Sequence, residues 1–162
     1  MNYLIIIRGP AGVGKTTISR KVALIINAEV FHFEKIMREL KLDYIAGDKW
    51  IPLNKFLMAD KIMLPKFKKA IKKHSIILDG NFYQREQIED LIKKIDSPHF
   101  VFTLKADIKE CVKRDKKRKG KLGEQATKDV FNLVSAFDYG ISIDTNNKTP
   151  EAVVRDIISF IS

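Results

Sequence analysis

Eight consecutive residues near the start of the chain have the types and spacing of a phosphate-binding loop. Gly9 and Gly14 stand five positions apart and are followed by Lys15 and Thr16. Glycines let backbone N–H groups approach phosphate oxygens closely, and the N-terminus of a following helix attracts the same anion. The lysine can reach the β- and γ-phosphates of a nucleotide, and the hydroxyl can ligate Mg²⁺. We therefore expect nucleotide binding by Gly9, Pro10, Ala11, Gly12, Val13, Gly14, Lys15, Thr16 and Thr17.

Such a loop needs a strand before it and a helix after it, and the hydrophobic pattern predicts both. The predicted strands are Tyr3–Arg8, Glu29–His32, Ser75–Asp79, His99–Leu104 and Ile141–Asp144. The predicted helices are Lys15–Ile26, Phe33 to about Lys41, Asn54–Lys73, Gln84–Ile95, Asp107–Arg118, Glu124–Phe137 and a last one that starts at Pro150 behind a Thr149 cap. Pro65 should kink or split the third helix.

Largely apolar strands that alternate with helices indicate a parallel sheet covered on both faces. We predict an α/β fold with three layers, a doubly wound parallel sheet of five strands in the order 2-3-1-4-5. The carboxyl ends of such strands face the ligand crevice. Asp79 ends one buried strand and is followed by Gly80, so its carboxylate is placed to hold the Mg²⁺ water shell or to orient an acceptor. The alternative role for Asp79 is that of a turn residue.

Length and composition limit the protein class. The 162 residues suffice for one domain, and 45% hydrophobic with 31% charged residues argues against a disordered or fibrous chain. Apolar runs are far below the ~20 residues of a membrane span, and no signal peptide is recognised. Cys111 is the single cysteine, which excludes an intrachain disulfide and a cysteine-cluster zinc site. We expect a cytoplasmic, single-domain protein without a membrane partner.

The net charge of +10 attracts polyanions such as nucleic acid or phosphorylated metabolites. Most of the basic residues are lysines, which favours a solvated surface over a dedicated groove, so nucleic acid is a possible but not a favoured partner. Neither Asn54-Lys55 nor Asn147-Lys148 has the Asp that a guanine-reading Asn-Lys-x-Asp motif requires. The chain is also too short for a large motor ATPase. A small kinase fits best.

Asp79-Gly80 with Gln87 eight positions after Asp79 resembles the Asp-Gly-Phe-Pro-Arg-x-x-x-Gln stretch of adenylate kinases and related nucleotide kinases. Together with the phosphate-binding loop, the whole chain is similar to this P-loop kinase group, which includes small polynucleotide and metabolite kinases. The resemblance implies a nucleoside-monophosphate-kinase-like domain over residues 1–162, with an acceptor-binding helical region at about 33–73 and a short lid at about 114–125. It implies ATP and Mg²⁺ as cofactors.

In this family the residue that corresponds to Gln87 helps to read the acceptor base, whereas its alternative role here is that of a helix-surface residue. The family arginine after Phe-Pro falls at Tyr83, so that phosphate contact is absent or comes from Arg85. Asn81, in the same stretch, is a further candidate for substrate binding.

An acid and an arginine at the start of the second helix also resemble the acceptor side of such kinases. Glu34 would accept or orient the acceptor proton, and Arg38 would bind an acceptor phosphate. The usual family spacing of three would instead put Lys35 at the acid position. The plainer alternative is an exposed i,i+4 ion pair between Glu34 and Arg38. We expect His32, at the strand end, to be structural.

The basic segment from Lys113 to Lys121 contains two candidate catalytic residues. At about 100° per residue along a helix, Arg114 and Arg118 fall on the same inward stripe as Ile108 and Cys111. A buried cation on this stripe needs an anionic partner. Lid arginines of related kinases clamp the transferred phosphoryl group. Gly120 and Gly123 would let such a lid close.

Two further loops are candidates. Tyr44 and residues 47–52 lie where related kinases receive the acceptor, and Trp50 would either stack on a base or anchor the core, the latter being the favoured role. Asn146 follows the last predicted strand, where the relatives' backbone contacts adenine; the alternative is a turn that leads to Thr149.

The combined hypothesis is ATP- and Mg²⁺-dependent phosphoryl transfer to a small acceptor, a nucleotide or nucleoside. Asp79, Glu34 and Arg38 form its acceptor side, and the loop with Arg118 forms its donor side. Two alternatives stay open: a polynucleotide 5′-kinase that acts on RNA or DNA ends, and a non-catalytic ATP-binding assembly or regulatory module. Acceptor identity and oligomeric state are not indicated by any residue.

Overall fold

The structure is a computed structural model that describes residues 1–43, 50–119 and 122–161. Its strands are β1 (Leu4–Arg8), β2 (Glu29–His32), β3 (Ile76–Gly80), β4 (His99–Lys105) and β5 (Ile141–Asp144). Its helices are α1 (Lys15–Ile26), α2 (Phe33–Glu39), α3 (Leu53–Ile71), α4 (Arg85–Ile95), α5 (Ile108–Lys117), α6 (Glu124–Ser135) and α7 (Pro150–Ile161). These bounds lie within two residues of the predicted ones.

The five strands form one parallel sheet in the order β2-β3-β1-β4-β5, which confirms the predicted fold and strand order. In the register of β1 with β3, Ile7 pairs with Asp79 and Arg8 with Gly80. On the other side Arg8 pairs with Thr103 of β4. The end of β1 therefore delivers the phosphate-binding loop next to the end of β3.

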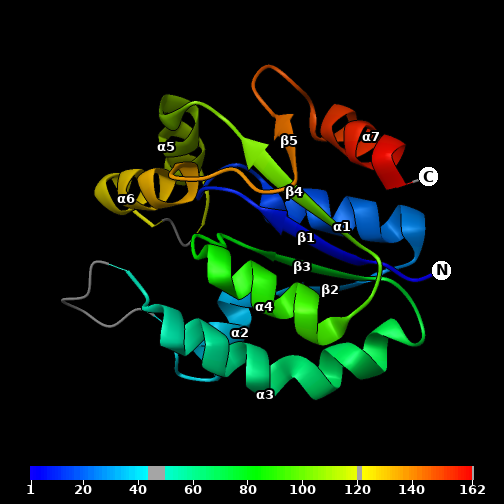
Figure 1. Cartoon of the computed structure of the whole chain (residues 1–162). Helices are drawn as coiled ribbons and strands as arrows, with labels where there is room; N and C mark the ends of the chain where they lie inside the picture. Colours follow the sequence, from blue (N-terminus) through cyan, green and yellow to red (C-terminus); the bar gives the residue numbers. More distant parts are fainter. Residues whose placement is uncertain (44–49, 120–121, 162) are drawn as a thin grey trace.

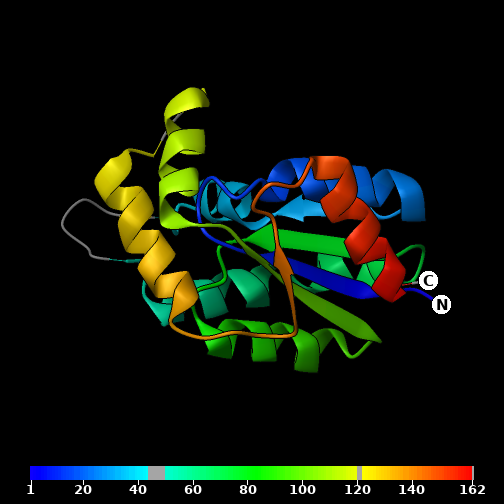
Figure 2. The ribbon, with the colours of Figure 1, turned by 90° about the horizontal axis from the view of Figure 1, so that it is seen from above.

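Helices cover both faces of the sheet, because the side chains of each strand alternate between two cores. Leu4 and Ile6 of β1 pack into the core beneath α2, α3 and α4, whereas Ile5 and Ile7 pack into the core beneath α1 and α7. Figure 1 shows these two layers of helices on opposite sides of the strands. Figure 2, seen from above, shows α5 and α6 beyond one edge of the sheet, at the carboxyl ends of the strands.

Pro65 does not split α3, which runs unbroken from Leu53 to Ile71. Phe56 and Ala59 before the proline and Phe67 and Ala70 after it are all buried in the same core, so packing holds both halves in one helix. The axis of α3 changes direction part-way along its length (Figure 1). The expected split is therefore wrong, and the expected kink is limited to this bend.

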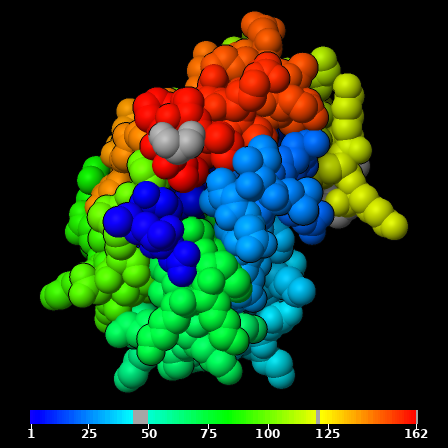
Figure 3. All heavy atoms as spheres, turned by 90° about the vertical axis from the view of Figure 1, so that its right-hand side faces the viewer, coloured from blue at the N-terminus to red at the C-terminus, as the bar shows by residue number. Residues whose placement is uncertain are grey.

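The last helix begins as predicted, with Pro150 as its first residue. The Thr149 hydroxyl accepts a hydrogen bond from the N–H of Ala152 at 3.2 Å, as a cap requires. The chain ends lie together at the amino ends of the strands, away from α5 and α6, as the dark blue and red segments of Figure 3 show. None of the described helices combines the length and apolar character that a bilayer span requires.

Candidate active site

The phosphate-binding loop follows β1 directly and turns into α1 at Lys15. A Cβ atom at Gly12, whose φ is +83°, would lie 2.5 Å from the carbonyl oxygen of Cys111, so glycine is needed there for close packing against α5. Gly14 caps the helix at a φ of +99°, in the left-handed region that glycine favours, and the space around it is open. The loop therefore has the backbone of an anion cradle at the N-terminus of α1.

Lys15 lies buried beneath the loop. Its ammonium group donates to the carbonyl oxygen of Pro10 at 2.9 Å and to Oδ1 of Asn81 at 3.0 Å. Burial lowers the pKa of Lys15, and the nearby carboxylates of Glu34 and Asp79 oppose that effect. Three predicted site residues, Glu34, Asp79 and Asn81, thus lie around this one cation.

Asp79 is buried at the end of β3 and is oriented by His32 at the end of β2. Both carboxylate oxygens of Asp79 lie 2.9 Å from Nδ1 of His32, and Asp79 is 4% exposed. The hydroxyl-bearing Thr16 is exposed on the first turn of α1. His32 was expected to be structural, and its contact makes it a neighbour of the site rather than a distant core residue.

A hydroxyl and a carboxylate are the oxygen ligands that Mg²⁺ prefers, so Thr16 and Asp79 fit this ion by their chemistry. Within the described part of the chain, no group of three His, Cys, Asp or Glu side chains is arranged to hold a metal. Sites that use one or two protein ligands and complete the shell with water and substrate phosphates are typical of Mg²⁺.

A cavity of about 1080 Å³ opens beside the loop on the side of α2 and α6. Predicted site residues that line it are Ala11, Glu34, Arg38, Trp50, Asn81, Gln87 and Arg118. Glu34 and Arg38 are both exposed, and no ion pair joins them among the contacts of the described residues. This arrangement favours the cavity-facing role of these two residues over the plain surface pair. Tyr44 and residues 47–49 lie outside the described residues.

Trp50 is 45% exposed and lines this cavity, so the favoured expectation that it anchors the core is wrong. The core beneath α2 and α3 is filled instead by phenylalanines, including Phe31, Phe33 and Phe67, whose rings contact one another. The indole is left at the cavity wall.

Gln87 is 1% exposed, so it is not a helix-surface residue. Its Nε2 donates to Oδ1 of Asp60, on α3, at 3.1 Å. Asp60 is itself fully buried. The helical pattern of α3 gave no reason to single out Asp60, because its partner lies 27 positions further along the chain.

Arg85 does not line the cavity among the described residues. Its guanidinium lies over the rings of Phe137, at 4.7 Å from the centroid, and Tyr139, at 5.6 Å. The structure therefore places Arg85 against the segment that follows α6 and does not bring it to the other predicted acceptor residues.

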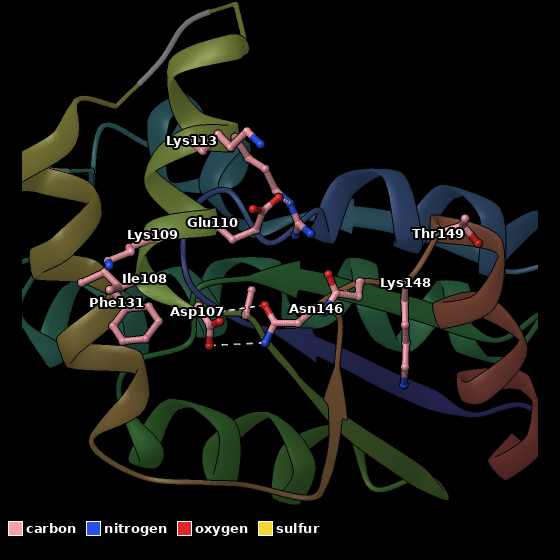
Figure 4. Close-up of a pocket in the computed structure, with 12 residues that line it drawn as sticks. Asp107, Ile108, Lys109, Glu110, Lys113, Phe131, Asn146, Lys148 and Thr149 are labelled. Carbon is pink, nitrogen blue, oxygen red and sulfur yellow. Dashed lines mark hydrogen bonds and ion pairs between the residues drawn. The ribbon is translucent and has the colours of Figure 1, made fainter.

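A second cavity, of about 1030 Å³, lies between α5 and the segment after β5. Arg114 lines it, donates to the carbonyl oxygen of Val13 at 3.3 Å and pairs with Glu110 at 3.1 Å. Asn146 faces Asp107 across the cavity floor, where its Oδ1 accepts from the Asp107 N–H at 3.0 Å (Figure 4). Arg114 and Asn146, both expected at the donor nucleotide, thus share this cavity.

Arg118 lies beyond the end of α5, since that helix stops at Lys117. Its Nε pairs with Asp115 at 3.0 Å, and its side chain is 45% exposed. The expectation that Arg114 and Arg118 both point inward is therefore confirmed only in part, because Arg118 is exposed. Arg118 lines the cavity of Glu34 and not the cavity of Arg114, so it lies on the side expected for the acceptor. Gly120 lies outside the described residues.

Comparison with known proteins agrees with this geometry. A family model described as an AAA domain matches residues 4–137, which is most of the chain. The chain belongs to this family of P-loop kinases. The protein named "Putative adenylate kinase" from Pyrococcus furiosus is 29% identical over 168 residues, which cover 98% of this chain and 84% of that protein.

Solved structures with the same fold include small kinases. Shikimate kinase from Acinetobacter baumannii matches with a TM-score of 0.67 at 18% identity, covering 99% of this chain and 93% of that one. Thymidylate kinase from Candida albicans matches with a TM-score of 0.69 at 16% identity, covering 99% and 91%. At these identities the matches show the fold of the P-loop kinase and leave its acceptor open.

Proposed function

We propose that this P-loop kinase transfers the γ-phosphoryl group of ATP to a small acceptor, a nucleotide or nucleoside. The observation that carries the proposal is that the loop contacts both cavities, since Ala11 lines one and Val13 accepts from Arg114 of the other, with Lys15 beneath it. A donor nucleotide in the cavity of Arg114 and an acceptor in the cavity of Glu34 would meet at the loop. The relative named as an adenylate kinase and the thymidylate kinase neighbour support a nucleotide acceptor.

In this proposal an oxygen of the acceptor attacks the γ-phosphorus, the bond from phosphorus to the β,γ-bridging oxygen breaks, and ADP leaves. Lys15, Arg114 and Arg118 would neutralise the charge spread over the transferred group. Glu34 would orient the attacking oxygen, and Arg38 would bind an acceptor phosphate. Thr16 and Asp79 would hold Mg²⁺, which supplies further charge neutralisation at the β- and γ-phosphates when bound. We assign the lid to about residues 114–125 and the acceptor region to about 33–73.

The test is Lys15→Met, which keeps the aliphatic stem and removes the ammonium group. Because the lost charge would act on the transition state, we expect kcat to fall by about a hundredfold to a thousandfold. The measurement is ADP release with a panel of nucleoside monophosphates and nucleosides. Lys93→Met, on the exposed side of α4, is the matched control and should retain full activity. Undiminished turnover in the Lys15 variant would contradict the proposal.

The same panel separates the proposal from a non-catalytic ATP-binding module. Such a module would bind ATP. At an ATP concentration a hundred times the dissociation constant, its free energy of unfolding would rise by roughly 2.7 kcal/mol. It would release no ADP with any acceptor. The polynucleotide alternative is favoured by one feature, the exposed lysines of α3, and is tested below at the scale of the whole molecule.

A further inference from the structure

Three polar side chains between α3 and α4 form a buried cluster that the proposed reaction does not use directly. Oδ1 of Asp60 accepts from Nε2 of Gln87 at 3.1 Å, and a side-chain hydrogen bond links Asp60 to the Asp90 carboxyl group. Oδ1 of Asp90 is paired with Lys94 at 2.9 Å. The chain Lys94–Asp90–Asp60–Gln87 therefore runs from the surface of α4 to the wall of the acceptor cavity.

A hydrogen bond between two carboxyl groups requires a proton on one of them. Burial, together with the hydrogen bond to Asp90, raises the pKa of Asp60 to about 9. Oδ2 of Asp60 and Oδ2 of Asp90 are both buried and find no N–H or O–H donor among the described residues. One proton shared between these two oxygens satisfies both of them. Oδ1 of Asp60 then carries no proton and can only accept.

This proton position fixes the polarity of the Gln87 amide. With Nε2 of Gln87 toward Asp60, an N–H donor faces the acceptor Oδ1 of Asp60. If the amide were flipped, Oε1 of Gln87 would face Oδ1 of Asp60, and two acceptors would meet without a proton between them. In the observed orientation Oε1 of Gln87 is buried and has no partner among the described residues. Two groups of the Gln87 amide are thus left to bind a ligand: Oε1 as an acceptor and the second N–H of Nε2 as a donor.

We propose that Asp60, hydrogen-bonded to Asp90, is a positioning residue that fixes the Gln87 amide so that the site selects acceptor bases with an amino group beside a ring nitrogen acceptor. Adenine and cytosine present this pair, whereas hypoxanthine and uracil present the reverse pair, a carbonyl beside a ring N–H. A freely rotating glutamine would serve both kinds of base by flipping. This inference rests on the proposed nucleotide acceptor and deepens it.

The test compares acceptors that differ only in this edge, AMP with IMP and CMP with UMP, in two Asp60 variants. Asp60→Asn can donate from Nδ2 to Asp90 and accept at Oδ1 from Gln87, so we expect it to keep the wild-type preference for the amino nucleotides. Asp60→Leu has a similar volume and cannot hold the amide. We expect its preference within each pair to fall by about tenfold, mainly through KM for the acceptor, with KM for ATP unchanged.

Glu86→Gln, an exposed acid-to-amide change on α4, is the matched control and should leave both ratios unchanged. A merely structural role of Asp60 would lower stability in the leucine variant without changing the ratio between two acceptors. Equal kcat/KM for AMP and IMP in the wild type, or an unchanged ratio in an active leucine variant, overturns the inference. Calorimetry measures the ratio of the AMP and IMP dissociation constants without turnover. If the protein binds AMP more tightly than IMP but catalyses no transfer, only the proposed function is contradicted. Equal binding of AMP and IMP, or binding of neither, contradicts this inference.

The pH dependence of stability provides a readout that needs no ligand. Among the described residues, the charged groups that act on Asp60 are Asp90 and Lys94, both on α4. Because the pKa of Asp60 is higher in the folded than in the unfolded chain, the folded state binds an extra proton between pH ~4 and ~9, and this contribution to stability declines as the pH rises. The melting temperature of Asp60→Asn relative to the wild type should therefore rise over that range. A difference that is flat with pH would show that Asp60 shares no proton with Asp90 and would overturn that part of the inference.

Discussion

At the scale of single residues, Arg8 is the largest departure from what its sequence position suggests. It ends an apolar strand, yet its guanidinium is fully buried and donates to the backbone carbonyl oxygens of Phe82, Val134 and Phe137 and to the Thr103 hydroxyl at 2.9–3.2 Å. Burial lowers the pKa of Arg8 to about 10, which still leaves it charged at neutral pH. One side chain thus ties β1 to β4, to the turn after β3 and to the end of α6.

We predict that Arg8→Met lowers the free energy of unfolding by about 3 kcal/mol, because it leaves three carbonyl oxygens without their buried donor. Urea denaturation measures the loss. Arg20→Met, at an exposed position of α1, serves as the control and should change stability by less than about 0.5 kcal/mol. A loss below about 1 kcal/mol in the Arg8 variant would show that water replaces the guanidinium in these contacts.

At the scale of elements, a buried carboxylate joins α5 to α6. Asp115 accepts hydrogen bonds from the N–H groups of Leu122 and Gly123, both at 2.9 Å, and pairs with Arg118. Burial alone would raise the pKa of Asp115, but these N–H groups and the arginine outweigh that effect and hold the pKa below its usual value. Asp115 therefore anchors the start of α6 on the side of the proposed lid.

We predict that Asp115→Ala exposes this connection, because two backbone N–H groups lose their acceptor. Amide hydrogen exchange at Leu122 and Gly123 should accelerate by roughly five- to a hundredfold, which corresponds to about 1–3 kcal/mol of local stability. Asp156→Ala, on α7, should leave both rates unchanged. The effect should be largest above the unfolded pKa of about 3.8 and shrink as the pH falls through the lower folded value. Equal exchange rates in the two variants would refute the anchoring role.

The sequence predicted those elements whose signal is local. The glycine spacing of residues 9–14 located the loop, and the alternation of apolar strands with helices predicted a parallel sheet covered on both faces. It did not predict contacts between distant side chains, such as Asp60 with Gln87 or Arg8 with Val134. The exposed Trp50 was misjudged for a related reason, since burial depends on which other aromatic side chains fill the core.

At the scale of the whole molecule, one face of α3 carries a group of exposed lysines without an exposed acid. Lys61, Lys66, Lys68 and Lys69 of α3, together with Lys72 and Lys73 just beyond it, are exposed, and the single acid of this helix, Asp60, is buried. The face lies on the layer beneath the sheet in Figure 1. Lysines in this arrangement are suited to phosphate backbones without base specificity.

We predict that replacing Lys66, Lys69 and Lys73 together with serine leaves phosphorylation of a nucleoside monophosphate unchanged, because none of them lines either cavity. A 5′-hydroxyl RNA oligonucleotide should accept no phosphate from the wild type. Transfer to that oligonucleotide, with affinity that falls with salt by about 0.7 log units per contacted phosphate and a shallower slope in the triple variant, would establish the polynucleotide alternative instead.

The parallel sheet also brings both ends of the described chain to one place, opposite the carboxyl edge that carries the loop and both cavities (Figures 1 and 3). Chain ends that lie so close favour circular permutation, in which a short linker joins them and new ends are opened in an exposed turn. A tether or fusion partner attached at either end would likewise point away from the ligand-binding edge. The enzyme could then be immobilised on a support with its cavities turned toward the solution.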